Sequence, residues 1–232
     1  MYEKTIICLA NSRKPPSSTG RCVAGKEVTG EYAGQWVRPI SPRPSHEVSI
    51  TERRYTDGTE IGLLDIIKIT FIEHQPLMHQ TENHVFDSSL KWEKKGKADW
   101  NQLREFIDPD DKYFWKTSSD TKHGINDEIF VTQLKDISSS LKLIYVQKLE
   151  LRVQSETYPG GSRRRVRGYL QYEGKNYLIS VTDPYIEMQY LHQKEGQYFI
   201  NDAILCISLA GVFEERKCAY RLIASVITKD RC

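Results

Sequence analysis

The chain has 232 residues, of which 39% are hydrophobic and 28% are charged, and its formal net charge at pH 7 is +2. This length and hydrophobic content suffice for one large domain, or for two small domains with cores of their own. A net charge this close to zero produces no strong overall field, so binding of an anionic polymer would depend on local clusters of cations.

Cysteine usage and the length of the apolar runs exclude further classes of protein. The five cysteines are scattered and form no CxxC pair, which argues against a structural zinc site and against a disulfide framework. No run of about eighteen apolar residues occurs, and the apolar run near the N-terminus is too short for a signal peptide. We therefore expect a cytoplasmic protein from a reducing compartment, without a membrane partner.

Residues 1–86 show the pattern of a small β barrel. Short β-branched apolar runs bounded by Gly, Pro, Asn or Asp indicate strands, and the residues after Ser45 permit a helix. We expect strands at 4–10, 21–28, 35–41, 63–74 and 81–86, with the helix at 46–55.

Residues 87–140 differ from the chain on either side, because they are rich in Lys, Asp, Ser and Trp. Asp99 is a suitable N-cap for a helix over 100–107, which the Asp-Pro pair at 108 and 109 would end. We interpret this stretch as a partly helical connecting insert without a core of its own.

Residues 141–232 give the clearest pattern. Asp183 is a suitable N-cap with Pro184 at the first helical position, so a helix is expected over 184–193. Three strands precede this helix and two follow it, which is the chain order of a five-stranded OB barrel. The sequence therefore predicts a mainly β protein of two OB-fold barrels in tandem, joined by the insert. The expected strands of the second barrel are 141–154, 163–173, 176–183, 203–211 and 219–227.

Several segments spread over the chain carry a family resemblance. They include KTIICLANSRK, RCVAGKEV, WVRPISPR, RVRGYLQY and VTDPYIEMQYL. In these segments the chain resembles the prokaryotic family called the dual OB-containing domain. The resemblance implies two OB folds and a nucleic-acid-binding module, an accessory factor of a defence or nucleic-acid-processing system, and it implies no catalytic motif. The loop KPPSSTGR at 14–21 is longer than the family pattern leads us to expect.

A cluster of arginines lies on the expected second strand of the second barrel. Alternation along this strand directs Val166 and Leu170 inward, on the same side as Arg164 and Tyr172. The opposite side is then exposed, where guanidinium groups can bind phosphates and a ring can stack on a base. The alternative is a charged outer face that nearby carboxylates such as Glu156 neutralise. The candidate nucleic-acid-binding residues on this strand are Arg163, Arg165, Arg167 and Tyr169.

The expected third strand of the first barrel carries an aromatic residue and a cation on one side. Such a combination suits a groove for a single strand, because a flat ring accepts any base and cations follow the phosphate backbone. The alternative is that the tryptophan belongs to the core and that the arginines have no binding role. The candidates in this barrel are Trp36, Arg38, Arg43, Arg53 and Arg54.

No motif in the sequence supports a metal site, a cofactor or catalysis. His79 and His84 are five residues apart, a spacing that places their rings on opposite sides of a strand. His123 and Asp127 lie in a glycine-containing stretch that is typical of a turn.

We therefore predict a non-catalytic module that binds single-stranded or structured DNA or RNA, and that could also have a protein partner from the same system. Two alternatives stay open. One is an adaptor that binds a protein through the apolar rim of a barrel. The other is a nuclease or nucleotide-modifying enzyme that uses insert residues such as His123.

Overall fold

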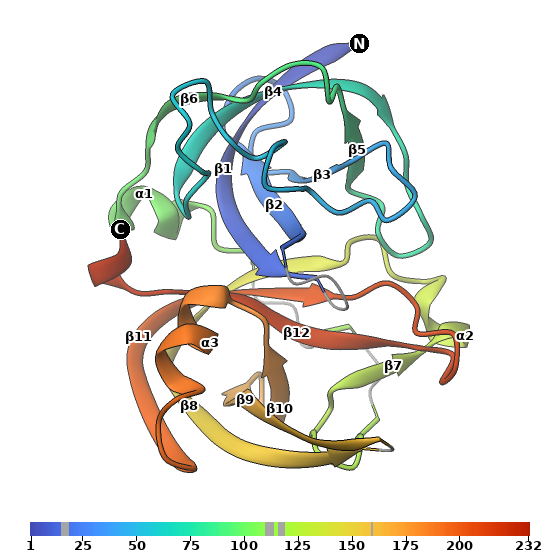
Figure 1. The fold of residues 1–232 in the computed structure, drawn as a ribbon, viewed down its shortest axis with the longest axis vertical. Coiled ribbons are helices and arrows are strands. Elements are labelled where there is room, and N and C mark those ends of the chain that lie inside the picture. Colours follow the sequence, from blue (N-terminus) through green and yellow to red (C-terminus); the bar gives the residue numbers. More distant parts are fainter. Residues whose placement is uncertain (15–18, 110–113, 116–118, 159) are drawn as a thin grey trace. The chain divides into compact units, whose positions relative to one another are not determined.

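A computed structural model describes the chain except for residues 15–18, 110–113, 116–118 and 159. The protein is mainly β, as predicted (Figure 1). Its chain separates into two compact units, Met1–Phe106 with Lys229–Cys232, and Ile107–Thr228. The middle of the long first loop expected at 14–21 lies outside the described residues. Within the described part of the chain, no helix is long and apolar enough to cross a membrane.

The first unit contains one ring of strands. β1 pairs antiparallel with β2 and β4, β2 pairs with β3, β3 runs parallel to β5, and β5 pairs with β4. This order is the predicted OB order, and the segment expected as the fifth strand is confirmed as β5. The elements are β1 (Tyr2–Arg13), β2 (Arg21–Glu27), β3 (Trp36–Ile40), β4 (Asp65–His74), β5 (Asn83–Phe86), β6 (Glu93–Lys97) and α1 (Trp100–Glu105).

The prediction of a helix over 46–55 is wrong, because this stretch forms turns and isolated bridges. Ser49 and Glu52 do exchange the hydrogen bonds of a helix start, with Ser49 N donating to Glu52 at 2.7 Å and Glu52 N donating to Ser49 Oγ at 3.3 Å. The turn ends there, since the Arg53 carbonyl accepts from Ile61 N at 3.1 Å. The backbone is thus used for pairing with residues 59–61 instead of for a helix.

The stretch expected as a separate insert is divided between the two units. β6 adds to β4 in the first unit, and α1 follows it with the predicted N-cap, Asp99, whose side chain accepts from the backbone N of Asn101 and Gln102. Further along, β7 adds to β12 in the second unit. Each ring is therefore extended by one strand that the insert supplies.

The second unit repeats the ring order of the first. β8 pairs antiparallel with β9 and β11, β9 pairs with β10, β10 runs parallel to β12, and β12 pairs with β11. The predicted helix lies between the third and fourth strands of this ring, as expected. The elements are β7 (Glu128–Phe130), α2 (Val131–Leu134), β8 (Leu141–Tyr158), β9 (Gly161–Tyr172), β10 (Lys175–Val181), α3 (Pro184–Tyr190), β11 (Gly196–Leu209) and β12 (Cys218–Ile227), followed by a short 3₁₀ helix, Lys229–Arg231, that belongs to the first unit.

The inner side of β9 is the one predicted from alternation. Val166, Leu170 and Tyr172 are buried in the core of the second unit, and the Tyr172 ring stacks on Phe114 with their centroids 4.4 Å apart. Between them, Gly168 packs so closely on β12 that a Cβ atom would lie 2.3 Å from an Ile223 side-chain carbon. The register of β9 is therefore fixed by its core contacts, and its other side faces outward.

Candidate nucleic-acid interface

The outer side of β9 carries the cations predicted to bind nucleic acid, but they are not equally exposed. Arg163 is exposed, and Arg165 and Tyr169 are half-buried. Arg167 is only 5% exposed, so its predicted exposure is wrong. Arg164, on the inner side, is exposed beyond the core, where its guanidinium donates to the Gln193 carbonyl after α3.

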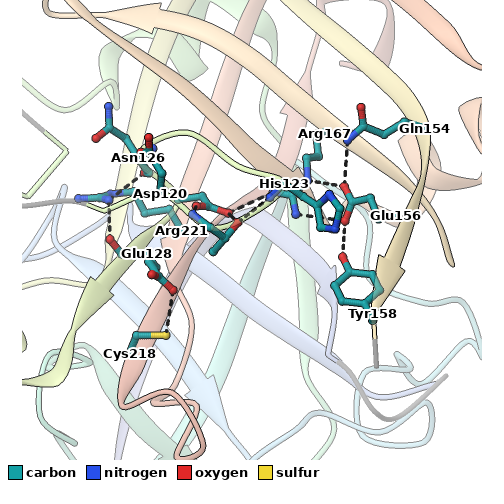
Figure 2. Close-up of polar contacts among 12 residues, drawn as sticks. Asp120, His123, Asn126, Glu128, Gln154, Glu156, Tyr158, Arg167, Cys218 and Arg221 are labelled. Atoms are coloured by element: carbon teal, nitrogen blue, oxygen red, sulfur yellow. Dashed lines mark hydrogen bonds and ion pairs between the residues drawn. The ribbon is translucent and has the colours of Figure 1, made fainter. Parts of the chain in front are cut away.

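Arg167 can be buried because two carboxylates, Glu156 and Asp127, neutralise it. Figure 2 labels Arg167 and Glu156. The Nε and Nη2 atoms of Arg167 donate to Glu156 at 2.5 and 3.2 Å, and its Nη1 donates to Asp127 at 3.2 Å. Burial by itself would raise the pKa of Glu156, but the hydrogen bonds from Arg167 and Tyr158 outweigh it and hold this pKa below its usual value. Arg167 is therefore a structural cation, the alternative that the sequence left open for this strand.

Asp127 belongs to a segment, residues 119–128, that lies along the edge of β10. Ile125 exchanges two backbone hydrogen bonds with Leu178 of β10, at 2.9 and 3.2 Å. Thr121 donates to Asp127 from its backbone N at 2.8 Å and from Oγ1 at 2.7 Å, which fixes the carboxylate beside Arg167. At Gly124 a Cβ atom would lie 1.9 Å from an Asp127 oxygen, so any side chain there would displace the carboxylate. Asp127 thus has a structural role.

A second buried arginine ties the same segment to β12. Arg221 donates to the backbone carbonyls of Asn126 at 2.9 Å and Phe114 at 2.8 Å, and its own N donates to the Asp127 carbonyl at 2.8 Å. Burial lowers the pKa of Arg221 to about 10, which leaves it charged at neutral pH. Segment 119–128 is therefore a fixed part of the second unit, beside the β9–β10 face where OB folds usually bind oligonucleotides.

The insert histidine considered for catalysis also has structural contacts. His123 shares a hydrogen bond of 3.2 Å with the Thr157 carbonyl, and its ring lies 5.5 Å from that of Tyr158. Among the described residues, no group of three or more His, Cys, Asp or Glu side chains is arranged to hold a metal ion. His123 thus packs against the end of β8 and has a structural role there.

The outer face continues from β9 over β8 to β11, where it gains residues that sequence reasoning missed. Glu150 of β8 is paired with Tyr169 on one side and with Phe199 of β11 on the other. The Arg152 guanidinium lies 4.6 Å from the Tyr169 ring centroid, and Lys148 Nζ lies 4.1 Å from that of Phe199. We call the outward-facing residues of β9, β8 and β11 the outer face; they are Arg163, Arg165, Tyr169, Lys148, Glu150, Arg152 and Phe199.

Two features of the outer face distinguish it from the cations of the first unit. Arg163 and Arg165 form no ion pair with any described residue. Phe199 is 51% exposed, so that much of its ring is accessible to a ligand. Alternation of Lys148, Glu150 and Arg152 along β8 was visible in the sequence, but its alignment with Phe199 depends on the pairing of β8 with β11.

In the first unit, the predicted aromatic and cationic pair on β3 is largely enclosed. Arg38 is buried, contrary to expectation, and its Nη2 lies 3.1 Å from Glu82, which is also buried. Trp36 is half-buried, with Lys26 Nζ 5.2 Å from its ring centroid. The same Lys26 Nζ donates to the Phe106 carbonyl at 2.8 Å. These side chains therefore hold the first unit together.

The other predicted cations of the first unit are paired with carboxylates as well. Arg43 Nη2 lies 2.7 Å from Glu52, which also caps the turn at Ser49. Arg53 is buried and lies 3.0 Å from Glu60, and the exposed Arg54 lies 3.7 Å from the same carboxylate. Each arginine predicted to bind nucleic acid in this unit therefore has a carboxylate partner within the unit.

Comparison with known proteins gives one result that covers almost the whole chain. The family model described as the dual OB-containing domain matches residues 4–226. No curated protein and no solved structure matches the chain. Since the two rings of strands and the family model agree over this range, the chain belongs to the dual OB-containing domain family.

Proposed function

We propose that this protein is a non-catalytic module that binds single-stranded nucleic acid, DNA or RNA, on the outer face of its second unit. The observation that carries the proposal is the position of Arg163 and Arg165, which form no ion pair with described residues and share one strand face with Tyr169. Guanidinium groups suit phosphates because they donate several hydrogen bonds in one plane, and rings beside them suit unpaired bases.

The ligand would be single-stranded because of the rings. In a duplex the faces of the bases are covered by their neighbours, so Tyr169 and Phe199 could stack only on bases that are unpaired. The cations alone would not discriminate between strand types, since they contact the backbone. A surface that combines both is what sequence-tolerant single-strand binding requires.

The first unit would contribute little to this binding. Using Arg38 for a phosphate would mean separating it from Glu82, which would then be left as a buried, uncompensated charge. Arg53 is itself buried beside Glu60. Glu156 and Asp127, the buried carboxylates beside the outer face, are likewise occupied by Arg167, which supports binding without chemistry. The family resemblance favours an accessory role in a prokaryotic defence or nucleic-acid-processing system.

Fluorescence anisotropy with labelled single strands of DNA and RNA, titrated over a range of KCl concentrations, tests the proposal. The double variant Arg163→Ala/Arg165→Ala should bind more weakly and should flatten the log–log salt slope by about 1.4, roughly 0.7 for each phosphate that is no longer neutralised. The charge-matched control is Lys95→Ala/Lys217→Ala, which removes two exposed cations that are paired with Glu93 and Glu214. Equal affinity in both variants would remove the outer face as the binding surface.

A second candidate function is binding of a protein partner, and one observation favours it. Tyr185 and Met188 are both exposed on α3, three residues apart and therefore on one side of the helix. A partner that stays bound at high salt and is released by Met188→Asp, together with no binding of any oligonucleotide, would favour this function over the first.

A further inference from the structure

The outer face contains one acidic residue whose position invites a specific explanation. Glu150 lies between Tyr169 and Phe199 in a single cross-strand row. Neighbouring strands are about 4.8 Å apart, so the backbone of Glu150 lies roughly that distance from the backbone of each ring-bearing residue. A carboxylate repels phosphate, and a surface that bound only the nucleic-acid backbone would gain nothing from it. Its place between two rings suggests that it contacts bases.

Glu150 is fixed in position by Arg152. Arg152 Nε lies 2.7 Å from Glu150 Oε1, and the Glu150 side chain is 16% exposed. Among the described residues, Oε2 accepts no hydrogen bond and the two Nη atoms of Arg152 donate none. An ionised carboxylate has about four lone-pair sites, so Glu150 can accept further hydrogen bonds while it stays paired. The pair therefore presents acceptors and donors side by side.

Guanine has the base edge that matches this pair best. Its Watson–Crick edge carries two adjacent donors, N1–H and the N2 amino group, next to one acceptor, O6. Adenine and cytosine each offer a single donor group on that edge. In thymine and uracil the N3–H lies between two carbonyl oxygens, which a carboxylate repels. A carboxylate can therefore accept two hydrogen bonds only from guanine, while Arg152 donates to O6.

We infer that the outer face binds an unpaired guanine, with its N1–H and N2 amino group donating to Glu150 and its ring stacked on Phe199. This inference rests on the proposed function and adds a base preference to it. Phe199 is the better platform of the two rings because it is the more exposed. Lys148 Nζ lies over one face of this ring, so the base would stack on the other face or displace the ammonium group toward the adjoining phosphate.

The experiment compares labelled nine-nucleotide strands that differ at one position. Oligothymidine with a central guanine should bind at least about 5-fold more tightly than oligothymidine alone, since one bidentate contact discriminates by about that much or more. Inosine, which lacks the N2 amino group, should lie between the two. This comparison uses the unaltered protein, so it does not depend on whether a variant folds.

Glu150→Gln then links the preference to the residue. It should lose the preference for guanine, so that the guanine-containing and the oligothymidine strands bind with equal affinity. Glu173→Gln, which neutralises an exposed carboxylate in the turn between β9 and β10, is the matched control and should keep it.

The outcomes separate this inference from the proposed function. Equal affinity for the guanine and thymine strands, with binding still weakened by Arg163→Ala/Arg165→Ala, overturns the guanine inference and leaves the proposed function standing. A guanine preference that survives Glu150→Gln also overturns it. Absence of binding to every strand overturns both.

Discussion

Replacing Glu156 by Gln tests how much the buried ion-pair network contributes to the second unit. The substitution keeps the size of the side chain but removes the charge that compensates Arg167 at 2.5 and 3.2 Å. Breaking a buried pair in this way costs about 3–5 kcal/mol of unfolding free energy, because the remaining charge is left buried and uncompensated. Asp127 stays 3.2 Å from Arg167, so we expect the lower end, about 3 kcal/mol.

Urea unfolding, monitored by hydrogen exchange in peptides from β9, measures this loss within the second unit. With an m value of about 2 kcal/mol/M, the midpoint should fall by about 1.5 M. The control is Glu214→Gln, which breaks the exposed Lys217–Glu214 pair and should change the free energy of unfolding by less than about 1 kcal/mol. Equal losses in the two variants would refute the reasoning that burial makes the Arg167 network important.

Three further predictions concern acid stability, core packing and the outer face. The contribution of Glu156, whose pKa is lowered in the folded chain, is present above the unfolded value of about 4.5 and is lost as the pH falls through the lower folded value. Thermal melts from pH 6 to 3 should therefore decline less steeply in Glu156→Gln, and parallel curves would contradict this. Gly168→Ala should lower the free energy of unfolding by about 1–3 kcal/mol, because its Cβ would lie 2.3 Å from an Ile223 carbon. Ile223→Val removes that carbon and should recover part of the loss in a double-mutant cycle; simple additivity would argue against the clash. Phe199→Ala should weaken single-strand binding by about 1–3 kcal/mol in anisotropy titrations. Tyr32→Ala, which removes a similarly exposed ring from the first unit, should leave the affinity unchanged, and equal effects would count against Phe199.

The parts of the fold that could be predicted from the sequence depend on local signals. The start of α3 follows from Asp183 and Pro184, and the Asp183 side chain does accept from Tyr185 N at 3.0 Å. The inner side of β9 follows from alternation, because burial of Val166 and Leu170 fixes every other residue of the strand. Where a single stretch of chain decides its own conformation, the sequence pattern is enough.

The misses have a common physical cause in long-range pairing. Arg167 alternates with core residues as an exposed residue should, yet it is paired with Glu156, eleven positions away, and with Asp127, forty positions away. The capping pattern of Ser49 and Glu52 is real, but pairing with residues 59–61 stops the helix after one turn. Phe199 joins the candidate site only through the register of β11 on β8. The pairing of Asp127 with Arg167, of residues 59–61 with Arg53 and of β11 with β8 could not be read from the local pattern.

The division of the insert between the two units bears on how the protein can be dissected. A fragment that begins at residue 141 would lack Phe114, which stacks on Tyr172, as well as Asp127 and the whole of β7. In this fragment Arg167 would keep one carboxylate partner instead of two, and β12 would lose its backbone pairing with β7. An autonomous second domain for binding studies should therefore span residues 107–228, even though the repeating strand pattern begins more than thirty residues later.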